Sequence, residues 1–180
     1  MDLRPAGPSD AATIAQLHAE SWRRHYRGAY ADSYLDGDIV AERRQVWAAR
    51  LAAGGHTLTV LAEDAGEPVG FVHVVFDADP RWGSLIDNLH VRYGRQRGGI
   101  GTALMARAAD GVRERATGKA RYLWVLEQNI AAQGFYRALG GAREERVAVA
   151  PPGGVPGRLR GKPHKLRYSW SQVPGQGSVG

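Results

Sequence analysis

Glycines occupy four of the eight positions from Gly94 to Gly101, and arginines lie in or beside this segment at Arg92, Arg95 and Arg97. Glycine has no Cβ, so the backbone N–H groups of such a loop can approach a ligand closely. The residues that follow have the apolar period of a helix, whose positive end favours an anion. Arginine keeps its charge at any ordinary pH. The segment therefore predicts a pyrophosphate site.

Two common kinds of phosphate site do not fit this pattern. A triphosphate-binding loop places a lysine before the Ser or Thr that opens the helix, but Thr102 follows Gly101. A dinucleotide site needs G-x-G-x-x-G in a first βαβ unit, whereas Gly99-x-Gly101 lies mid-chain without a third glycine in register. Another class of phosphate ligand is indicated.

The hydrophobic pattern predicts the elements that position this loop. The side chains of Ser9 and Asp10 indicate the N-cap of a helix, and a second helix runs roughly from residue 39 to 51 before Gly54 and Gly55. Strands are expected in HTLTVLAED and VGFVHVVFD as a hairpin, then in SLIDNLHV, RYLWVLE, AREERVAVA and HKLRYSWSQ, with helices after the glycine loop and in AAQGFYRAL. This order predicts a single α/β domain with a mixed central sheet at residues 2–171, followed by a loose tail at 172–180.

Two motifs in the right order resemble the GNAT superfamily of acyl-CoA N-acyltransferases. Gln96-x-x-Gly99-x-Gly101 is similar to the family's R/Q-x-x-G-x-G/A loop. About 30 residues later, the strand LWV is followed by Asn129-x-x-Ala132-x-x-Phe135-Tyr136, which resembles the family's fifth strand and next helix. Tyr93 stands where the family often has proline. The resemblance covers roughly residues 2–171 and implies a sheet whose strands 4 and 5 splay apart.

The resemblance implies acetyl-CoA as co-substrate and a primary amine as acceptor, with direct attack in a ternary complex. Tyr136 would protonate the departing thiolate. The pantetheine arm would lie along Leu89, His90 and Val91, and Asn129 would lie beside the CoA, although its position equally suits a helix N-cap. The pyrophosphate would be bound by Arg95, Gln96, Arg97, Gly98, Gly99, Ile100, Gly101 and Thr102.

The attacking amine needs a base. An amine of pKa about 10.4 is neutral only about once in 2,500 at pH 7, a cost of about 4.6 kcal/mol. Asp87 is our candidate base, because it precedes the expected splay on a strand position that is acidic in some relatives. Glu127 and His90 are the alternatives, and a carboxylate at a strand end is more often a solvated surface group.

Aromatic residues recur every four positions at Trp22, Tyr26, Tyr30 and Tyr34, although Gly28 interrupts a continuous helix. They predict either a core-facing stripe or a wall that receives an amine by cation–π attraction. Candidate acceptor-binding residues are Trp22, Tyr26, Tyr30, Trp82 and Glu127, and Asp32, Asp36 and Asp38 lie near enough in sequence to attract a cation.

The net charge of +6 is divided unevenly. Residues 1–80 carry 7 basic and 12 acidic side chains, and residues 81–180 carry 17 and 6. Either the basic half binds an anion and the acidic half a cation, or the halves interleave in the fold and the asymmetry has little meaning. The five basic residues between Arg158 and Arg167 favour a solvated face over a nucleic-acid contact.

The chain has no cysteine, which excludes thiolate chemistry and fits the cytoplasm. Its six histidines show no metal-ligand spacing, so no metal is expected. No membrane span and no nucleic-acid partner are expected, and a homodimer stays open. The leading hypothesis is a small-molecule N-acetyltransferase. The alternatives are a protein lysine or N-terminal acetyltransferase, a non-catalytic acyl-CoA-binding module and, more weakly, a nucleic-acid-binding protein.

Overall fold

The computed structural model describes residues 1–171, so the predicted tail at 172–180 lies outside the described residues. Its strands are β1 (Asp2–Pro5), β2 (Thr57–Asp64), β3 (Glu67–Asp79), β4 (Gly83–Val91), β5 (Arg121–Leu126), β6 (Ala142–Ala148) and β7 (His164–Trp170). Its helices are α1 (Ala11–His25), α2 (Asp32–Leu35), α3 (Ile39–Ala53), α4 (Ile100–Arg115) and α5 (Ile130–Ala138). The hairpin, the helix after the glycine loop and the C-terminal strand pair are where the sequence predicts them.

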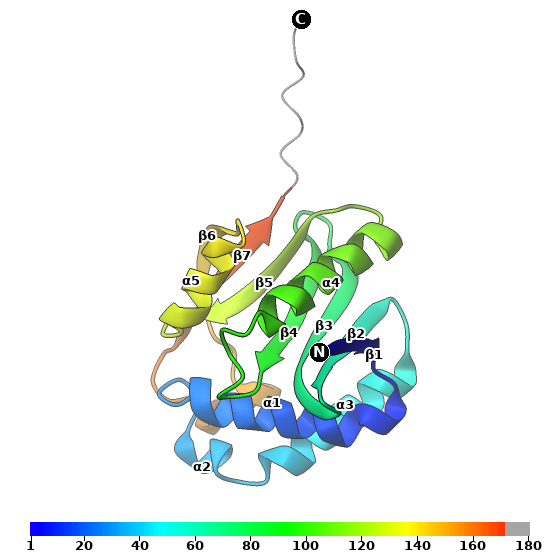
Figure 1. Ribbon diagram of the computed structural model, residues 1–180. Helices are drawn as coiled ribbons and strands as arrows, with labels where there is room; N and C mark the ends of the chain where they lie inside the picture. Colours follow the sequence, from blue (N-terminus) through cyan, green and yellow to red (C-terminus); the bar gives the residue numbers. More distant parts are fainter. Residues whose placement is uncertain (172–180) are drawn as a thin grey trace, which may run out of the picture.

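The strands form one sheet in the order β1-β2-β3-β4-β5-β7-β6 (Figure 1). All neighbours pair antiparallel except β4 and β5, which are parallel. This is the mixed sheet that the sequence predicts, with α4 as the crossover between the two parallel strands.

Helices pack on both faces of the sheet. Val72 and Val74 of β3 contact the cluster that includes α4, whereas Phe71 belongs to the cluster formed with α1 and Trp47 of α3. Neighbouring residues of a strand point to opposite faces, so α4 lies on one face and the α1–α3 layer on the other (Figure 1). Among residues 1–171, none of the helices combines the length and the apolar character that crossing a membrane requires.

Strands β4 and β5 separate soon after they begin. They pair only at Ser84 with Arg121 and at Leu85 with Tyr122. On the other edge of β4, Val74 pairs with Ile86 and His73 with Asn88, so Asp87 is the extra residue of a β-bulge. A bulge bends a strand and increases its twist. The predicted splay of strands 4 and 5 is therefore present, and it begins at the bulge.

Two local expectations need correction. The sequence did not predict β1, a four-residue strand that pairs with β2. The carboxylate of Asp10 does not cap α1: it accepts from the Gly7 N–H at 2.8 Å and from Arg4 at 2.7 Å, which satisfies it before the helix begins. The predicted interruption of the aromatic series is present: α1 ends at His25, Gly28 with φ +88° lies in the segment that follows, and the series extends over α1, this segment and α2.

Candidate functional site

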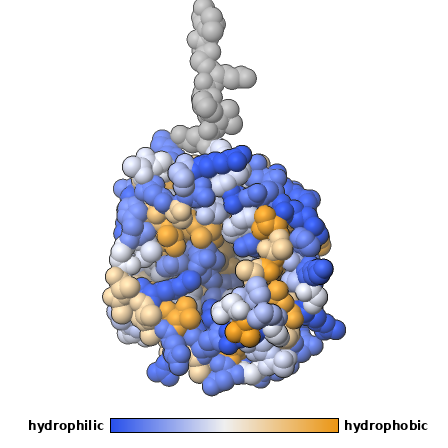
Figure 2. Space-filling view, turned by 180° about the vertical axis from the view of Figure 1, so that it is seen from behind, coloured by the Kyte–Doolittle hydropathy of each residue, from blue (hydrophilic) through white to orange (hydrophobic). Residues whose placement is uncertain are grey.

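A cavity of about 980 Å³ fills the gap where β4 and β5 diverge. Its walls come from α1, α3, β4, the glycine loop, α4, β5, α5 and β7. The molecular surface on the side away from the viewer of Figure 1 is hollowed near its centre (Figure 2). The lining residues include the predicted Trp22, Tyr26, Tyr30, Asp87, Leu89, His90, Val91, Gln96, Arg97, Gly99, Gly101, Thr102, Asn129 and Tyr136.

The glycine loop presents a run of free amides at one end of this cavity. Within the described residues, none of the backbone N–H groups from Gln96 to Thr102 donates to a protein acceptor, because the first helical bond runs from Ala103 to Gly99. Gly99 has φ +80°, a left-handed conformation that turns the chain into α4. Unpaired amides at a helix N-terminus are a ready anion site.

The two loop arginines diverge. Arg97 and Gln96 line the main cavity, whereas the guanidinium of Arg95 is paired with Asp64 at the end of β2. Gly98 and Ile100 are, like Arg95, part of a small separate depression near Met1. Arg97 is therefore the loop cation nearest the cavity, and Arg95 is committed to the hairpin.

The β4 edge offers polar groups to the gap. Arg92 donates its backbone N–H to Val69 O at 2.8 Å, just beyond the last strand pair. Hydrogen-bonded pairs alternate along an antiparallel ladder, so this bond directs the N–H groups of Leu89 and Val91 away from β3. They point toward the gap, where β5 does not pair with them.

Tyr136 lies on α5, on the same face of the sheet as α4. Its side chain is 8% exposed and packs 6.0 Å from the ring of Tyr168 and 6.1 Å from that of Trp170. Burial raises the pKa of the Tyr136 phenol above its usual range, so the hydroxyl keeps its proton at neutral pH. Asn129 begins this helix: its side chain accepts from the Ala132 N–H at 3.1 Å, so it is a helix cap that also lines the cavity.

Asp87 points from the β4 bulge into the cavity and is held on two sides. Its Oδ2 lies 2.7 Å from the Arg50 guanidinium and accepts from the Asn88 side-chain amide at 2.7 Å. The carboxylate is thus ion-paired and fixed in orientation.

A pair of neutral histidines lies between α1 and β4. His90 Nδ1 is 2.7 Å from Ser21 Oγ, and burial lowers the pKa of His90 to about 3. His18 Nδ1 accepts from Trp47 Nε1 at 2.9 Å, and its ring centroid is 4.8 Å from that of His90. Burial also lowers the pKa of His18, so both rings are uncharged at neutral pH.

The aromatic residues of α1 and the following segment form one wall. The ring of Trp22 lies 5.3 Å from those of Tyr26 and Tyr30, which are 4.8 Å from each other. Tyr30 also packs with Leu126 at the end of β5. These side chains pack together and also line the cavity, so the predicted stripe and the predicted wall are the same surface; its role in binding an amine stays a prediction.

Two predicted acceptor residues lie outside the lining. Trp82 stacks 4.4 Å from the Arg167 guanidinium, and Glu127 is ion-paired with Arg146 at 2.8 Å. Glu127 is therefore also poorly placed as a base. In residues 1–171, no three His, Cys, Asp or Glu side chains gather into a group that could hold a metal ion.

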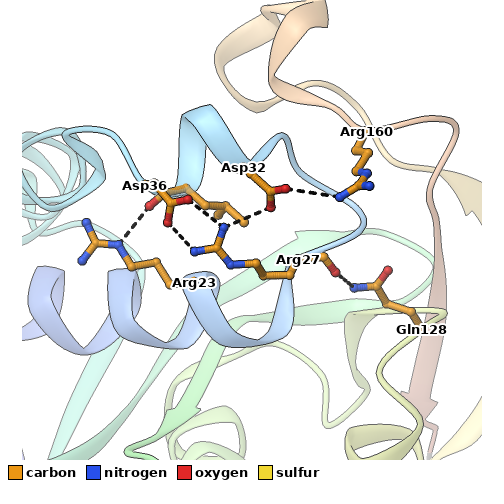
Figure 3. Close-up of polar contacts among 7 residues, drawn as sticks. Arg23, Arg27, Asp32, Asp36, Gln128 and Arg160 are labelled. Atoms are coloured by element: carbon orange, nitrogen blue, oxygen red, sulfur yellow. Dashed lines mark hydrogen bonds and ion pairs between the residues drawn. The ribbon is translucent and has the colours of Figure 1, made fainter.

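Two of the three acidic residues predicted to attract a cation, Asp32 and Asp36, are already paired within the protein, whereas Asp38 forms no salt bridge among residues 1–171 and does not line the cavity. Arg27 contacts both Asp32 and Asp36, and Arg160 lies 3.2 Å from Asp32 (Figure 3). Gln128 donates to the Arg27 carbonyl at 2.7 Å, which ties this segment to the end of β5. The carboxylates of Asp32 and Asp36 are not free to attract a cationic acceptor.

Sequence reasoning missed several lining residues: Ser21 on α1, Arg43 and Arg50 on α3, and Lys165 on β7. One of these residues, Lys165, could have been found from the alternation of side chains between the two faces of β5 and β7. Leu123, Val125 and Leu166 face α4 and α5, so their neighbours Trp124 and Lys165 must face the other layer.

Comparison with known proteins agrees with this geometry. A family described as "Acetyltransferase (GNAT) family" matches residues 14–140. A probable N-acetyltransferase from Mycobacterium tuberculosis is 31% identical over 137 residues, which are 74% of this chain and 75% of that protein.

Two solved structures share the fold. PaiA N-acetyltransferase from Thermoplasma acidophilum, in complex with coenzyme A, aligns with TM-score 0.70 and 18% identity over 94% of this chain and 98% of its own. A putative acetyltransferase from Salmonella typhimurium with its cofactor acetyl-CoA aligns with TM-score 0.67 and 19% identity over 95% and 93%. The chain therefore belongs to the acetyltransferase (GNAT) family and is an acetyltransferase.

Proposed function

We propose that the protein transfers the acetyl group of acetyl-CoA to a primary amine of a small molecule by direct attack in a ternary complex. The carrying observation is the β4–β5 gap, in which the free edge of β4 leads to the unpaired amides from Gln96 to Thr102. A long ligand that is polar at one end and amide-like along its arm matches this path. The two solved relatives that hold coenzyme A or acetyl-CoA support the choice.

In this proposal the CoA pyrophosphate binds the loop amides, assisted by Arg97. The residues from Gln96 to Thr102 supply free backbone N–H groups, whereas the Arg95 N–H already donates to Arg92 O at 3.0 Å and the Arg95 side chain pairs with Asp64. The pantetheine arm extends the β4 edge through the amides of Leu89 and Val91. One of these N–H groups polarises the thioester carbonyl and binds the oxyanion that develops during attack. Asn129 closes the α5 side.

The chemistry needs two proton transfers. The amine nitrogen forms a bond to the thioester carbon and loses one proton, while the C–S bond breaks and the sulfur takes a proton from Tyr136. The buried, protonated phenol of Tyr136 suits the acid role. We assign the base role to Asp87, whose ion-paired carboxylate lines the cavity and takes the proton directly or through a water.

A small acceptor is favoured over a protein chain because two segments close the end of the cavity that lies away from the glycine loop. The segment at Tyr30 forms a bridge with Leu159, and the Ala31 N–H donates to Arg158 O at 2.9 Å. Leu159 and Arg158 belong to the loop between β6 and β7, and Val149 and Ala150 at the start of this loop line the cavity. The α1–α2 segment and the loop between β6 and β7 thus narrow the acceptor side.

Two measurements test the proposal. Isothermal calorimetry with acetyl-CoA should show one site per chain, and a panel of small amines should give release of free CoA above the hydrolytic background. Absence of acetyl-CoA binding at about 0.1 mM would refute the proposal as a whole. Acetylation of peptide amines alone would refute the small-molecule acceptor.

A further inference from the structure

The cavity has two halves, one on each face of the sheet. The α4–α5 half holds the amide loop and Tyr136. The other half is bounded by α1 and α3 and by the faces of β5 and β7 that carry Trp124 and Lys165. The thioester must lie between the two, so the acceptor occupies the second half.

This acceptor half is unexpectedly cationic. Its charged lining residues are Arg43, Arg50, Lys165 and Asp87. Asp87 is its one carboxylate among the described residues, and Arg50 lies 2.7 Å from it. Arg43 contacts Glu42 at 2.7 Å, but Glu42 also lies 3.1 Å from Arg158.

Lys165 is the cation of this half that forms no salt bridge within residues 1–171. Its ammonium nitrogen lies 4.6 Å from the centroid of the Trp124 ring, and no carboxylate of residues 1–171 lies within ion-pair distance. The side chain is half-buried. Burial and Arg167 lower its pKa below the usual value, and the carboxylate of Asp87 acts in the opposite direction. A buried ammonium is costly without an anionic partner.

Two further donors beside Trp22 lack partners. The Nε of Arg43 and the Nε2 of His18 are buried, and each makes no hydrogen bond within the described structure. Trp47 donates to His18 Nδ1, so the neutral ring carries its hydrogen on Nε2. Arg43 and His18 pack against the Trp22 ring, each with 4.6 Å to its centroid, and both line the cavity. Both atoms have almost no accessible surface, so a ligand acceptor would satisfy them only after these side chains shift toward the cavity.

We propose that the acceptor is an amino acid, a small amine that also carries a carboxylate, and that Lys165 and Arg43 bind this carboxylate in the acceptor half of the cavity. The inference rests on the proposed function and specifies its substrate. Anchoring the carboxylate leaves the amine free to approach the thioester carbon, and the aromatic wall packs against the apolar part of the molecule. A polyamine, which has no anionic group, would be repelled by the same charges.

The test uses pairs of acceptors that differ only in the carboxylate. L-phenylalanine is compared with 2-phenylethylamine, L-methionine with 3-(methylthio)propylamine and L-lysine with cadaverine, across a panel that includes all the common amino acids and spermidine. Free CoA release gives kcat/KM. At least one amino acid should exceed its decarboxylated partner by about tenfold or more.

Variants then assign the carboxylate contact. Lys165→Gln should raise KM for the amino acid about tenfold or more while leaving its decarboxylated partner and the KM for acetyl-CoA unchanged. Lys165→Arg should restore most of the affinity. Lys162→Gln, an exposed lysine of the same region that does not line the cavity, is the matched control and should behave as the parent protein.

The outcomes separate the two proposals. Acetyl-CoA binding with turnover of spermidine or cadaverine, and of no carboxylate-bearing amine, would overturn the inference and leave the proposed function standing. Loss of activity toward both members of a pair in Lys165→Gln would also overturn it, because that pattern indicates a structural role. Failure of the parent protein to bind acetyl-CoA would instead remove the proposed function itself.

Discussion

Tyr136 is the residue on which the proposed acid step depends. Tyr136→Phe is expected to lower kcat by about 100-fold or more at pH 7, because the thiolate then leaves without a proton donor. Since burial raises the pKa of this phenol, the hydroxyl stays protonated through pH 9, and the loss should be nearly constant between pH 7 and 9. Steady-state CoA release at three pH values measures it.

Tyr168 supplies the matched control for that experiment. Its ring lies 6.0 Å from the Tyr136 ring, and its hydroxyl is buried without a hydrogen-bond partner in the described structure. Tyr168→Phe also removes a buried phenol hydroxyl, but Tyr168 does not line the cavity, so this variant should retain full activity. Equal activities for Tyr136→Phe and the parent protein would show that the acid role is wrong.

The base assignment is tested by comparing two neighbours on β4, Asp87 and His90. Asp87→Asn should reduce kcat/KM for the amine by about 100-fold or more at pH 7, with acetyl-CoA binding retained. Asp110→Asn changes an exposed carboxylate of α4 and should have no effect on turnover. If the Asp87→Asn variant kept the parent kcat/KM and the His90→Gln variant lost it, the base role would belong to His90.

At the scale of elements, the N-terminus of α4 must carry no side chain at position 99, so that a ligand can reach its backbone amides. Gly99 has φ +80°, and a Cβ placed on it would have no protein atom within 4 Å, so a side chain there meets backbone strain and then occupies ligand space. Gly99→Val should weaken acetyl-CoA binding about tenfold or more by calorimetry. Gly54→Val places the same side chain at a left-handed position, φ +61°, at the end of α3. It should lose stability but keep the dissociation constant, and equal weakening in both variants would count against the loop assignment.

Gly101 has a different reason to be glycine. A Cβ there would lie 3.2 Å from Phe135 Cζ, so the small residue lets α4 approach α5. The loop motif therefore combines a ligand-facing glycine with one that sets helix packing, and spacing alone does not distinguish them.

Regular elements were predictable because each one repeats a local pattern. The hairpin of β2 and β3 is buried on both faces and is a continuous apolar, β-branched run, whereas the helix α4 buries one face, so both patterns are visible in the sequence. The four-residue β1 contains a proline and has no period, and its place is set by pairing with β2. The bulge at Asp87 is likewise set by the register between strands.

The residues of the candidate site likewise fall into those that a local sequence pattern predicts and those that only the fold brings together. The loop residues and Tyr136 could be found because they form a motif along the chain. Lys165, Arg43 and Ser21 come from separate elements and meet only through the topology of the sheet and the α1–α3 layer. Trp82 and Glu127 are close in sequence to site elements, but their partners Arg167 and Arg146 hold them outside the lining.

At the scale of the whole molecule, the acidic and basic halves of the chain interleave. Arg160 pairs with Asp32, Arg158 with Glu42 and Arg95 with Asp64, each joining the basic C-terminal half to the acidic N-terminal half. Of the two interpretations of the charge asymmetry, the structure favours mutual neutralisation over an acidic surface for a cationic substrate.

This pairing leads to a prediction about polyanions. Much of the basic surface is engaged internally, so retention of the protein on double-stranded DNA should be weak and should disappear by about 0.2 M salt. Fluorescence anisotropy with a labelled duplex at 0.05 and 0.2 M salt measures it. Arg160→Gln, which removes one of these paired cations, should lower the low-salt signal little, whereas binding that persists at 0.2 M salt would restore the nucleic-acid interpretation.

The fold as a whole should also depend on pH through its N-terminal ion pairs. Arg4 joins Asp10 at the start of the helical layer to Glu63 of β2 and holds the pKa of Asp10 below its usual value. A depressed pKa stabilises the fold above the unfolded-state pKa, and this stabilisation is lost as the pH falls through the folded-state value.

Asp10→Asn should therefore lower the free energy of unfolding by about 1–3 kcal/mol at pH 7. The difference from the parent protein should shrink steadily between pH 5 and 2, as followed by urea denaturation with circular dichroism. Asp2→Asn, on the exposed end of β1, is the control and should show little effect at any pH. An Asp10→Asn penalty that stays constant down to pH 2 would mean that the side chain acts through packing and not through its charge.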